Sequence, residues 1–172
     1  MESPIEKLYN FCPNCRTALA RKDIEGRKRP ACPECGFVYW NNPKPACSVI
    51  IGKNHKVLML RRGREPLKGY WVLPGGFIEY EEEPRDAAIR ETKEETGLDI
   101  EITGLVGVYQ ITNDPRGIHL DIIYSGRILN ENPVISDESS VYGFFPAGNL
   151  PEPIAYRHKE AIKEWNAAPK KA

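Results

Sequence analysis

The alternation of apolar and polar positions along the chain predicts mixed strands and two helices. Apolar runs at 46–51 and 57–60, separated by a polar stretch, predict a β-hairpin. The pattern also predicts a central helix at 84–96 and a terminal helix at 154–167. Mixed strands around two helices indicate the α/β class and a sandwich of layers. Further strands are expected at 70–73, 100–110, 118–128 and 140–146.

The predicted central helix carries an unusual concentration of negative charge. Pro84 suits its first position, where no backbone donor is needed, and Gly97 can end it with a positive φ. Glu91, Glu94 and Glu95 project from one face, near the helix end where the macrodipole disfavours anions. A solvated charged face is the alternative, but such faces usually alternate their signs. The pattern therefore indicates a functional site whose partner is a hard divalent cation such as Mg²⁺.

The segment around this helix resembles the Nudix box, G-x5-E-x7-R-E-U-x-E-E-x-G-U, in which U is a bulky apolar residue. It spans residues 76–98 and reads GFIEYEEEPRDAAIRETKEETGL. One position departs from the pattern, because Thr92 stands where the first U is expected. The preceding WVLPGG is similar to the strand and turn that lead into the box, and the resemblance covers roughly residues 43–165. The fixed positions are occupied by Gly76, Glu82, Arg90, Glu91, Glu94, Glu95, Gly97 and Leu98.

The resemblance implies a Nudix α/β/α sandwich with a mixed sheet, which hydrolyses a nucleoside diphosphate linked to another moiety. By motif position, it implies that Glu91, Glu94 and Glu95 act in catalysis as ligands of Mg²⁺ or Mn²⁺. The backbone carbonyl of Gly75 is a further implied ligand. Clustered metal ions can neutralise a pyrophosphate, activate water for attack on phosphorus and stabilise the leaving phosphate.

The resemblance also assigns roles to polar residues beyond this ligand set. Glu82 is expected to brace the loop before the helix, and Arg90 is expected to pair with a helix glutamate. In the family, a glutamate in the region of residues 134–145 often ligates metal or activates water. Glu138 is the best match by position, and Asp137 is the alternative. The other interpretation is that both are solvated loop acids, because loops carry acids freely.

Two further segments offer candidate substrate-binding residues. Arg61 and Arg62 end an apolar strand, so strand alternation places one of them on the active-site side, where it can meet a phosphate. The segment DPRGIH resembles the D-P-R-G-H segment of some ADP-ribose pyrophosphatases, with one isoleucine inserted. This resemblance makes Asp114 and Arg116 candidates for binding substrate. A type I turn with proline at its second position explains the same residues equally well.

A second motif lies near the N-terminus, where four cysteines form C-x2-C-x16-C-x2-C. This spacing is typical of a structural zinc site with four thiolates, and the segment resembles a zinc ribbon. A full thiolate shell leaves no open position, so we expect one structural Zn²⁺. Disulfides or a redox pair fit the spacing less well. The expected ligands are Cys12, Cys15, Cys32 and Cys35, whereas Cys47 lies in an apolar run and is expected to be buried.

Length and charge bound the organisation of the chain. Its 172 residues, with no net charge, allow one medium domain and a small second module. We expect a zinc ribbon over residues 1–42, with its ligands within 9–40, and a Nudix hydrolase domain over 43–172. Residues 1–44 hold eight basic and five acidic residues, a net charge of +3. Solvated charge explains this small excess better than a nucleic-acid partner does.

The sequence also bears on location and on several conspicuous side chains. The first residues lack the apolar core of a signal peptide, and no apolar run approaches the ~18 residues that span a bilayer. We therefore expect a cytoplasmic protein without a membrane partner, and the sequence leaves a homodimer open. Trp71 and Trp165 are expected to pack in the core. His119 and His158 are expected to be ordinary polar residues rather than metal ligands.

The choice of substrate depends on short motifs. The DPRG segment favours ADP-ribose, cleaved to AMP and ribose 5-phosphate, so the expected partner is a small-molecule nucleotide. Zinc-ribbon members of the family include NADH pyrophosphatases, but their S-Q-P-W-P-F-P-x-S signature is absent from the sequence after the box. Cleavage of FAD, clean-up of nucleoside triphosphates and removal of RNA 5′ caps remain open. A non-catalytic module that senses nucleotide or binds nucleic acid is the alternative of another class, and the complete glutamate triplet argues against it.

Overall fold

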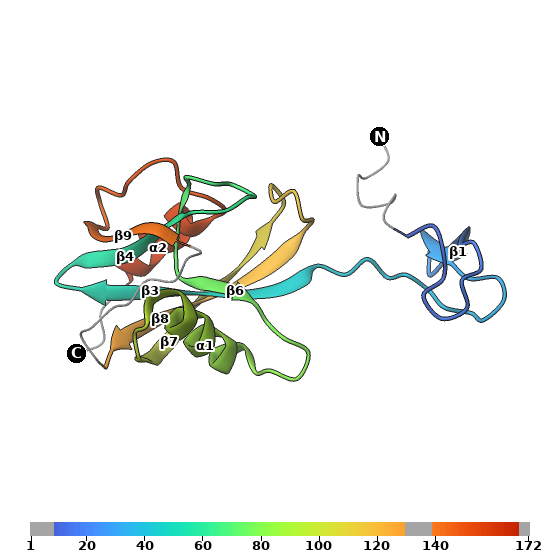
Figure 1. The fold of residues 1–172 in the computed structure, drawn as a ribbon, viewed down its shortest axis with the longest axis horizontal. Helices are drawn as coiled ribbons and strands as arrows, with labels where there is room; N and C mark the ends of the chain where they lie inside the picture. Colours follow the sequence, from blue (N-terminus) through green and yellow to red (C-terminus); the bar gives the residue numbers. More distant parts are fainter. Residues whose placement is uncertain (1–8, 130–138, 169–172) are drawn as a thin grey trace. The chain divides into compact units, whose positions relative to one another are not determined.

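The chain divides into two units, Met1–Asn42 and Pro43–Ala172. The computed structural model describes residues 9–129 and 139–168, and Figure 1 shows their strands and helices. None of the helices formed by these residues is long and apolar enough to cross a membrane. The smaller unit contains one hairpin, and the larger unit contains the main sheet and the helices α1 (Pro84–Thr96) and α2 (His158–Ala167).

The smaller unit is built on a hairpin of two short strands, β1 (Ala20–Ile24) and β2 (Arg27–Ala31). Glu25 and Gly26 turn the chain between them with positive φ angles of 53° and 75°, as a tight two-residue hairpin turn requires. The buried hydrophobic side chains of this unit are Cys12, Ala31 and Cys32. Since residues 9–42 bury so little apolar surface, a unit of this size is expected to draw stability from another source, such as a metal ion.

The larger unit is a mixed sheet flanked by helices. Its strands are β3 (Lys44–Lys53), β4 (Lys56–Arg62), β5 (Trp71–Val72), β6 (Gly75–Phe77), β7 (Ile100–Ile111), β8 (His119–Ile128) and β9 (Ser139–Pro146). The principal order is β5-β4-β3-β8-β7, with β6 paired to β3 and β9 paired to β4. The pairing of β3 with β8 is parallel, and the other pairings are antiparallel. This arrangement brings β6, β3 and β8 side by side.

Successive residues of β3 point to opposite faces of the sheet, as expected for a strand. Val49 and Ile51 belong to an apolar cluster that also contains two alanines of α1. Ile50 belongs to a second cluster, together with Ile162 of α2. The two helices therefore cover opposite faces of the sheet (Figure 1), and the expected α/β/α sandwich is confirmed. Trp71 and Trp165 pack against the second cluster, as expected.

The buried face of α1 consists of small residues. Thr92, which departs from the box pattern, is fully buried, and its hydroxyl donates a hydrogen bond of 2.8 Å to the carbonyl of Ala88. The polar side chain is therefore satisfied inside the core, and a bulky apolar residue is not required at this position. The helix ends as expected at Gly97, which has a φ of 69° and donates its N–H to the carbonyl of Lys93 at 2.8 Å.

The terminal helix is shorter than its sequence pattern predicts. It was expected to begin near Ile154, but α2 begins at His158. Ile154 instead forms a β-bridge with Trp71, and the next residue donates its N–H to the Trp71 carbonyl at 2.9 Å. Tyr156 has a positive φ of 59°, which is incompatible with a right-handed helix. Pairing with β5 therefore overrides the helical period in this segment.

Candidate active site and metal centre

The four N-terminal cysteines converge on one point of the smaller unit. Their sulfur atoms all lie within 4.8 Å of one another. The Sγ–Sγ separation is 3.5 Å for Cys12–Cys35 and 3.4 Å for Cys15–Cys32. A tetrahedral site with zinc–sulfur bonds of ~2.3 Å has sulfur–sulfur edges of about 3.8 Å, so the arrangement fits Zn²⁺. All four thiols are free, and their separation far exceeds the ~2.05 Å of a disulfide.

Two glycines allow the strand before α1 to approach the helix glutamates closely. A Cβ at Gly75 would lie 2.2 Å from the carbonyl oxygen of Cys47, and the φ there is 152°. A Cβ at Gly76 would lie 2.4 Å from the carboxyl carbon of Glu91. Both distances are far inside van der Waals contact, so any side chain at either position would displace β3 or the glutamate. The glycines of the WVLPGG stretch are therefore required by packing at the site.

The three helix glutamates occupy different environments. Glu95 accepts a hydrogen bond of 2.9 Å from the backbone N–H of Gly75, and Glu91 accepts one of 2.8 Å from Arg90. Both side chains line one cleft of the larger unit, whereas Glu94 does not and is 59% exposed. Among the described residues, only the cysteines already converge as three or more metal ligands. Arg90 bridges the carboxylates of Glu91 and Glu94, whereas the carboxylate of Glu95 is held by Gly75 instead.

Arg90 joins the helix to the loop that precedes it. Its guanidinium donates two hydrogen bonds of 2.8 Å to the Glu82 carboxylate and one of 3.2 Å to Glu94. These bonds lower the pKa of the Glu82 carboxyl, which also accepts a bond of 3.3 Å from the backbone N–H of Glu79. Glu82 does not line the cleft. This geometry supports a structural role for the Glu82–Arg90 pair, which fixes the loop against α1.

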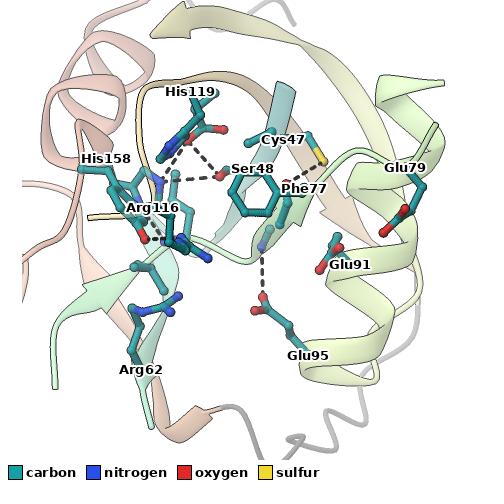
Figure 2. Close-up of a pocket in the computed structure, with 17 residues that line it drawn as sticks. Cys47, Ser48, Arg62, Phe77, Glu79, Glu91, Glu95, Arg116, His119 and His158 are labelled. Carbon is teal, nitrogen blue, oxygen red and sulfur yellow. Dashed lines mark hydrogen bonds and ion pairs between the residues drawn. The ribbon is translucent and has the colours of Figure 1, made fainter. Parts of the chain in front are cut away.

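The glutamates form one end of a cleft of about 290 Å³. Figure 2 shows Glu79, Glu91 and Glu95 on one side of this cleft, with arginine and histidine side chains opposite. The cationic side contains Arg62, whose Nε donates to the Pro66 carbonyl at 2.8 Å. A cleft with carboxylates at one end and cations at the other can hold metal ions beside a polyanion.

The two candidate arginines of β4 differ as strand alternation requires. Arg62 lines the cleft. Arg61 does not, and its Nε donates to the carbonyl of Gly69 at 3.1 Å on the exposed side. Arg62 is therefore the better candidate for phosphate contact.

Asp114 and Arg116 act together at the cationic end of the cleft. The N–H of Gly117 donates to the Asp114 carbonyl at 3.0 Å, so the predicted turn is present. The fully buried Asp114 carboxylate accepts bonds of 2.7 and 3.1 Å from the Arg116 guanidinium. Burial alone would raise the pKa of Asp114, but the bonds from Arg116 lower it to about 2. Arg116 lines the cleft and Asp114 does not, so the turn serves to present the arginine.

A buried polar network beneath the cleft was not predicted from the sequence. Asp121 accepts hydrogen bonds of 3.0 Å from the Ser48 hydroxyl and 3.1 Å from His158 Nε2, while His158 Nδ1 accepts the N–H of Leu73 at 2.9 Å. All three network side chains line the cleft. The second oxygen of the Asp121 carboxylate is buried without a hydrogen-bond partner, which is unusual away from ligand sites. The sequence feature that could have revealed this network is the single carboxylate, Asp121, in the otherwise largely apolar strand β8.

His119 is also part of the cleft wall rather than a plain surface residue. Its side chain is buried, and this burial lowers the pKa of its imidazole, so the ring stays neutral near pH 7. Its ring packs edge-on against Phe77 at 5.8 Å and Tyr156 at 5.5 Å. The remaining candidates, Glu138 and its alternative Asp137, lie outside the described residues.

The match to known proteins identifies the class to which this fold and cleft belong. The model of the NUDIX domain matches residues 42–165, and the chain belongs to the Nudix hydrolase family. The solved structure of a NUDIX hydrolase from Nitrosomonas europaea superimposes with a TM-score of 0.79 and 29% identity, and covers 94% of this chain and 95% of that one. The expected family and fold are therefore confirmed.

Two curated relatives carry more specific names. An ADP-ribose pyrophosphatase of Methanocaldococcus jannaschii is 37% identical over 125 residues, which cover 72% of this chain and 73% of that protein. An NAD-capped RNA hydrolase NudC of Chromobacterium violaceum is 34% identical over 155 residues, which cover 88% of this chain. The second match spans only 56% of the relative's own length.

Proposed function

We propose that this protein is a Mg²⁺- or Mn²⁺-dependent pyrophosphohydrolase that cleaves ADP-ribose to AMP and ribose 5-phosphate. The observation that carries the proposal is one cleft with Glu91 and Glu95 at one end and Arg62 and Arg116 at the other. A pyrophosphate is a polyanion that needs cations on both sides, and this cleft offers metal ligands on one side and guanidinium groups on the other. The similarity to an archaeal ADP-ribose pyrophosphatase supports the choice of substrate.

The proposed metal ligands fit a hard cation. Glu91, Glu94 and Glu95 offer carboxylate oxygens, and Gly75 offers a carbonyl, which are the donors that Mg²⁺ prefers. When bound, the ion neutralises the pyrophosphate and makes a coordinated water more acidic. The protein's own part is to hold Glu95 against Gly75 and Glu91 beside Arg90, so that the carboxylates stay aimed at the cleft.

The remaining side chains bind the substrate and handle the proton. Arg116, fixed by its bidentate pairing with Asp114, donates to phosphate oxygens together with Arg62. We assign the base that takes the proton from the attacking water to Glu138, with the helix glutamates as the alternative. A base must lie within about 3 Å of that water, directly or through one bridge.

We also propose that the four cysteines bind one structural Zn²⁺. The support is their convergence at tetrahedral spacing in a unit whose described residues fully bury only one other side chain, that of Ala31. A closed shell of four thiolates leaves the ion no position for substrate or water.

A second candidate substrate is a nicotinamide dinucleotide. The relative named NAD-capped RNA hydrolase covers 88% of this chain, a larger share than the ADP-ribose pyrophosphatase does. Against this candidate stands the absence of S-Q-P-W-P-F-P-x-S from the sequence after the box.

Product analysis on a substrate panel tests the proposal. The full-length, zinc-loaded protein is incubated with Mg²⁺ and ADP-ribose, FAD, NADH or a deoxynucleoside triphosphate, and the products are resolved by ion-exchange chromatography. We expect AMP and ribose 5-phosphate from ADP-ribose, with the highest kcat/KM of the panel. Rapid cleavage of FAD, NADH or a triphosphate without AMP from ADP-ribose would overturn the choice of substrate.

A further inference from the structure

The smaller unit contains a second concave site, well away in sequence from the catalytic residues. It is a groove of about 180 Å³ beside the β1–β2 hairpin. Four cationic and two aromatic side chains dominate its lining, and no acidic residue takes part. The lining residues are Arg21, Arg27, Lys28, Arg29, Pro30, Tyr39, Trp40 and Asn41.

The fold sorts charges that are interleaved in the sequence. Asp23 and Glu25 lie between the groove cations along the chain, yet neither lines the groove. Asp23 instead accepts a hydrogen bond of 3.1 Å from the N–H of Gly26 and so belongs to the hairpin turn. The net charge of +3 over residues 1–44 therefore understates the local positive potential, because the groove concentrates cations without their acidic neighbours.

Trp40 and Arg29 form an ordered wall of this groove. The guanidinium of Arg29 lies 4.7 Å from the centre of the Trp40 ring and donates a hydrogen bond of 2.8 Å to the Trp40 carbonyl. The Nε of Arg29 is buried and has no hydrogen-bond partner, which is unusual for a buried donor. Trp40 itself is 43% exposed.

The neighbouring tyrosine is fixed as well. The ring of Tyr39 packs on that of Tyr9, with their centres 4.2 Å apart, and its hydroxyl donates to Asn41 at 3.2 Å. The aromatic part of the wall therefore needs little reordering on binding, which lowers the entropic cost of holding a ligand against it.

We propose that this groove binds single-stranded nucleic acid. Lysine and arginine side chains neutralise phosphates along a strand, and an exposed indole adds stacking that every base can use. A duplex hides its bases from such stacking, and an acidic peptide has no flat rings to fill the aromatic side. Arg27, Lys28 and Arg29 supply phosphate contacts, and Trp40 supplies the platform. This inference does not depend on which nucleotide the catalytic cleft hydrolyses. It revises the expectation that solvated charge explains the basic excess better than a nucleic-acid partner does.

Fluorescence anisotropy with a labelled 12-nucleotide RNA tests the proposal on the full-length, zinc-loaded protein. The groove variant combines Arg27→Glu and Lys28→Glu. The matched control combines Arg16→Glu and Lys22→Glu, which make the same charge change at exposed positions of the same unit outside the groove. A third variant, Trp40→Ala, removes the platform without changing charge. Elemental analysis checks that each variant keeps its zinc.

We expect the groove variant to weaken RNA binding at least tenfold, whereas the control weakens it less than threefold. The slope of log K against log salt should fall by about 1.4 in the groove variant, because two phosphate contacts on a single strand are lost. Trp40→Ala should weaken binding severalfold and leave the slope unchanged. Single-stranded DNA of the same sequence separates RNA from DNA as the strand bound, since the 2′-hydroxyl is the group that differs.

Three outcomes would overturn the inference. If the groove variant and the control weaken RNA binding equally, overall charge rather than the groove explains the binding. A duplex that binds as tightly as the single strand would exclude a site that reads unpaired bases. A poly-glutamate peptide that displaces RNA at an equal charge concentration would show a general anion site. None of these results bears on ADP-ribose hydrolysis, which is assayed separately on the same samples.

Discussion

The two units of this protein carry proposed metal sites of opposite kinds. In the smaller unit, Cys12, Cys15, Cys32 and Cys35 already converge, with all sulfurs within 4.8 Å of one another. In the larger unit, Glu91 and Glu95 face the same cleft but are each held by a partner, Arg90 and the N–H of Gly75. Soft thiolates form a closed cage for Zn²⁺, whereas hard carboxylates leave room for Mg²⁺, water and substrate phosphates.

The difference extends to what stabilises each unit. The larger unit buries two apolar clusters on the two faces of its sheet, so its fold does not need its metal. Among residues 9–42, the smaller unit fully buries only Ala31 besides Cys12 and Cys32, so we expect the free energy of metal binding to supply most of its folding free energy. Loss of metal should therefore abolish structure in one unit and chemistry in the other.

The largest expected effect comes from breaking the thiolate cage. Cys32→Ser should unfold residues 9–40, because a small unit without an apolar core loses its main source of stability. We expect loss of the amide NMR signals of this unit and of bound zinc, while the signals of the larger unit persist. Cys47→Ala is the matched control, since this thiol is buried in the larger unit and should leave one zinc per chain. A folded smaller unit in zinc-free Cys32→Ser protein would contradict the account.

The next effect tests the carboxylate site. Glu95→Gln and Glu91→Gln should each lower kcat for ADP-ribose roughly a thousandfold, because each removes a charge that holds metal against the pyrophosphate. The melting temperature of the larger unit should change little. Glu101→Gln, which removes a carboxylate from an exposed ion pair with Arg127, should leave kcat unchanged. Turnover near that of the wild type in Glu95→Gln would refute the metal assignment.

Substitutions at the cationic end of the cleft should lower activity about tenfold less than substitutions of Glu91 or Glu95. Arg116→Ala removes a charge-assisted hydrogen bond to phosphate, which is worth about 1.5–3 kcal/mol, so kcat/KM should fall roughly ten- to a hundredfold. Arg61→Ala provides the comparison, because Arg61 does not line the cleft, and its loss should change kcat/KM less than twofold. If both variants lose activity equally, the arginines act through net charge rather than through contact.

The proposed base gives a smaller and more specific effect. Glu138→Gln should lower kcat more than tenfold with little change in KM, because it slows proton transfer without weakening substrate binding. Asp137→Asn should change kcat much less. Small and equal effects of the two substitutions would return the role of base to the helix glutamates.

Glu82→Gln should show the smallest effect on activity. Its carboxylate pairs with Arg90 and accepts the N–H of Glu79, but it does not line the cleft. The amide keeps one acceptor, so we expect a loss of severalfold in kcat/KM, with a lower melting temperature. A loss as large as that of Glu95→Gln would place Glu82 among the metal ligands instead.

Local patterns predicted that the four cysteines converge and that Glu91 and Glu95 share one surface, because these residues lie close together in the sequence. The cysteine spacing and the box both describe turns and one helix, whose geometry depends on short-range rules. Strand alternation similarly predicted that one of Arg61 and Arg62 faces the cleft, and the structure selects Arg62. The resemblance also grouped Glu94 with Glu91 and Glu95, although only the latter two line the cleft.

Features that join distant segments escaped sequence analysis. Ser48, Asp121 and His158 come from β3, β8 and the start of α2, and they meet only when β3 pairs with β8 and α2 packs on the sheet. The hydrophobic pattern of a single segment cannot show that side chains from distant segments come into contact. The terminal helix was predicted too long for a related reason, since the pairing of Ile154 with Trp71 is a contact between segments 83 residues apart. The sorted charges of the smaller unit likewise follow from hairpin geometry rather than from composition.

A metal titration of ADP-ribose hydrolysis tests the contrast between the two sites most directly. The protein is dialysed against a weak chelator until elemental analysis gives one zinc per chain and no magnesium, and AMP release is then followed as Mg²⁺ is added. The account predicts no turnover before addition, saturable turnover with Mg²⁺, and an unchanged zinc content throughout. Turnover by the zinc-only protein, or activity that follows zinc content rather than Mg²⁺, would contradict it.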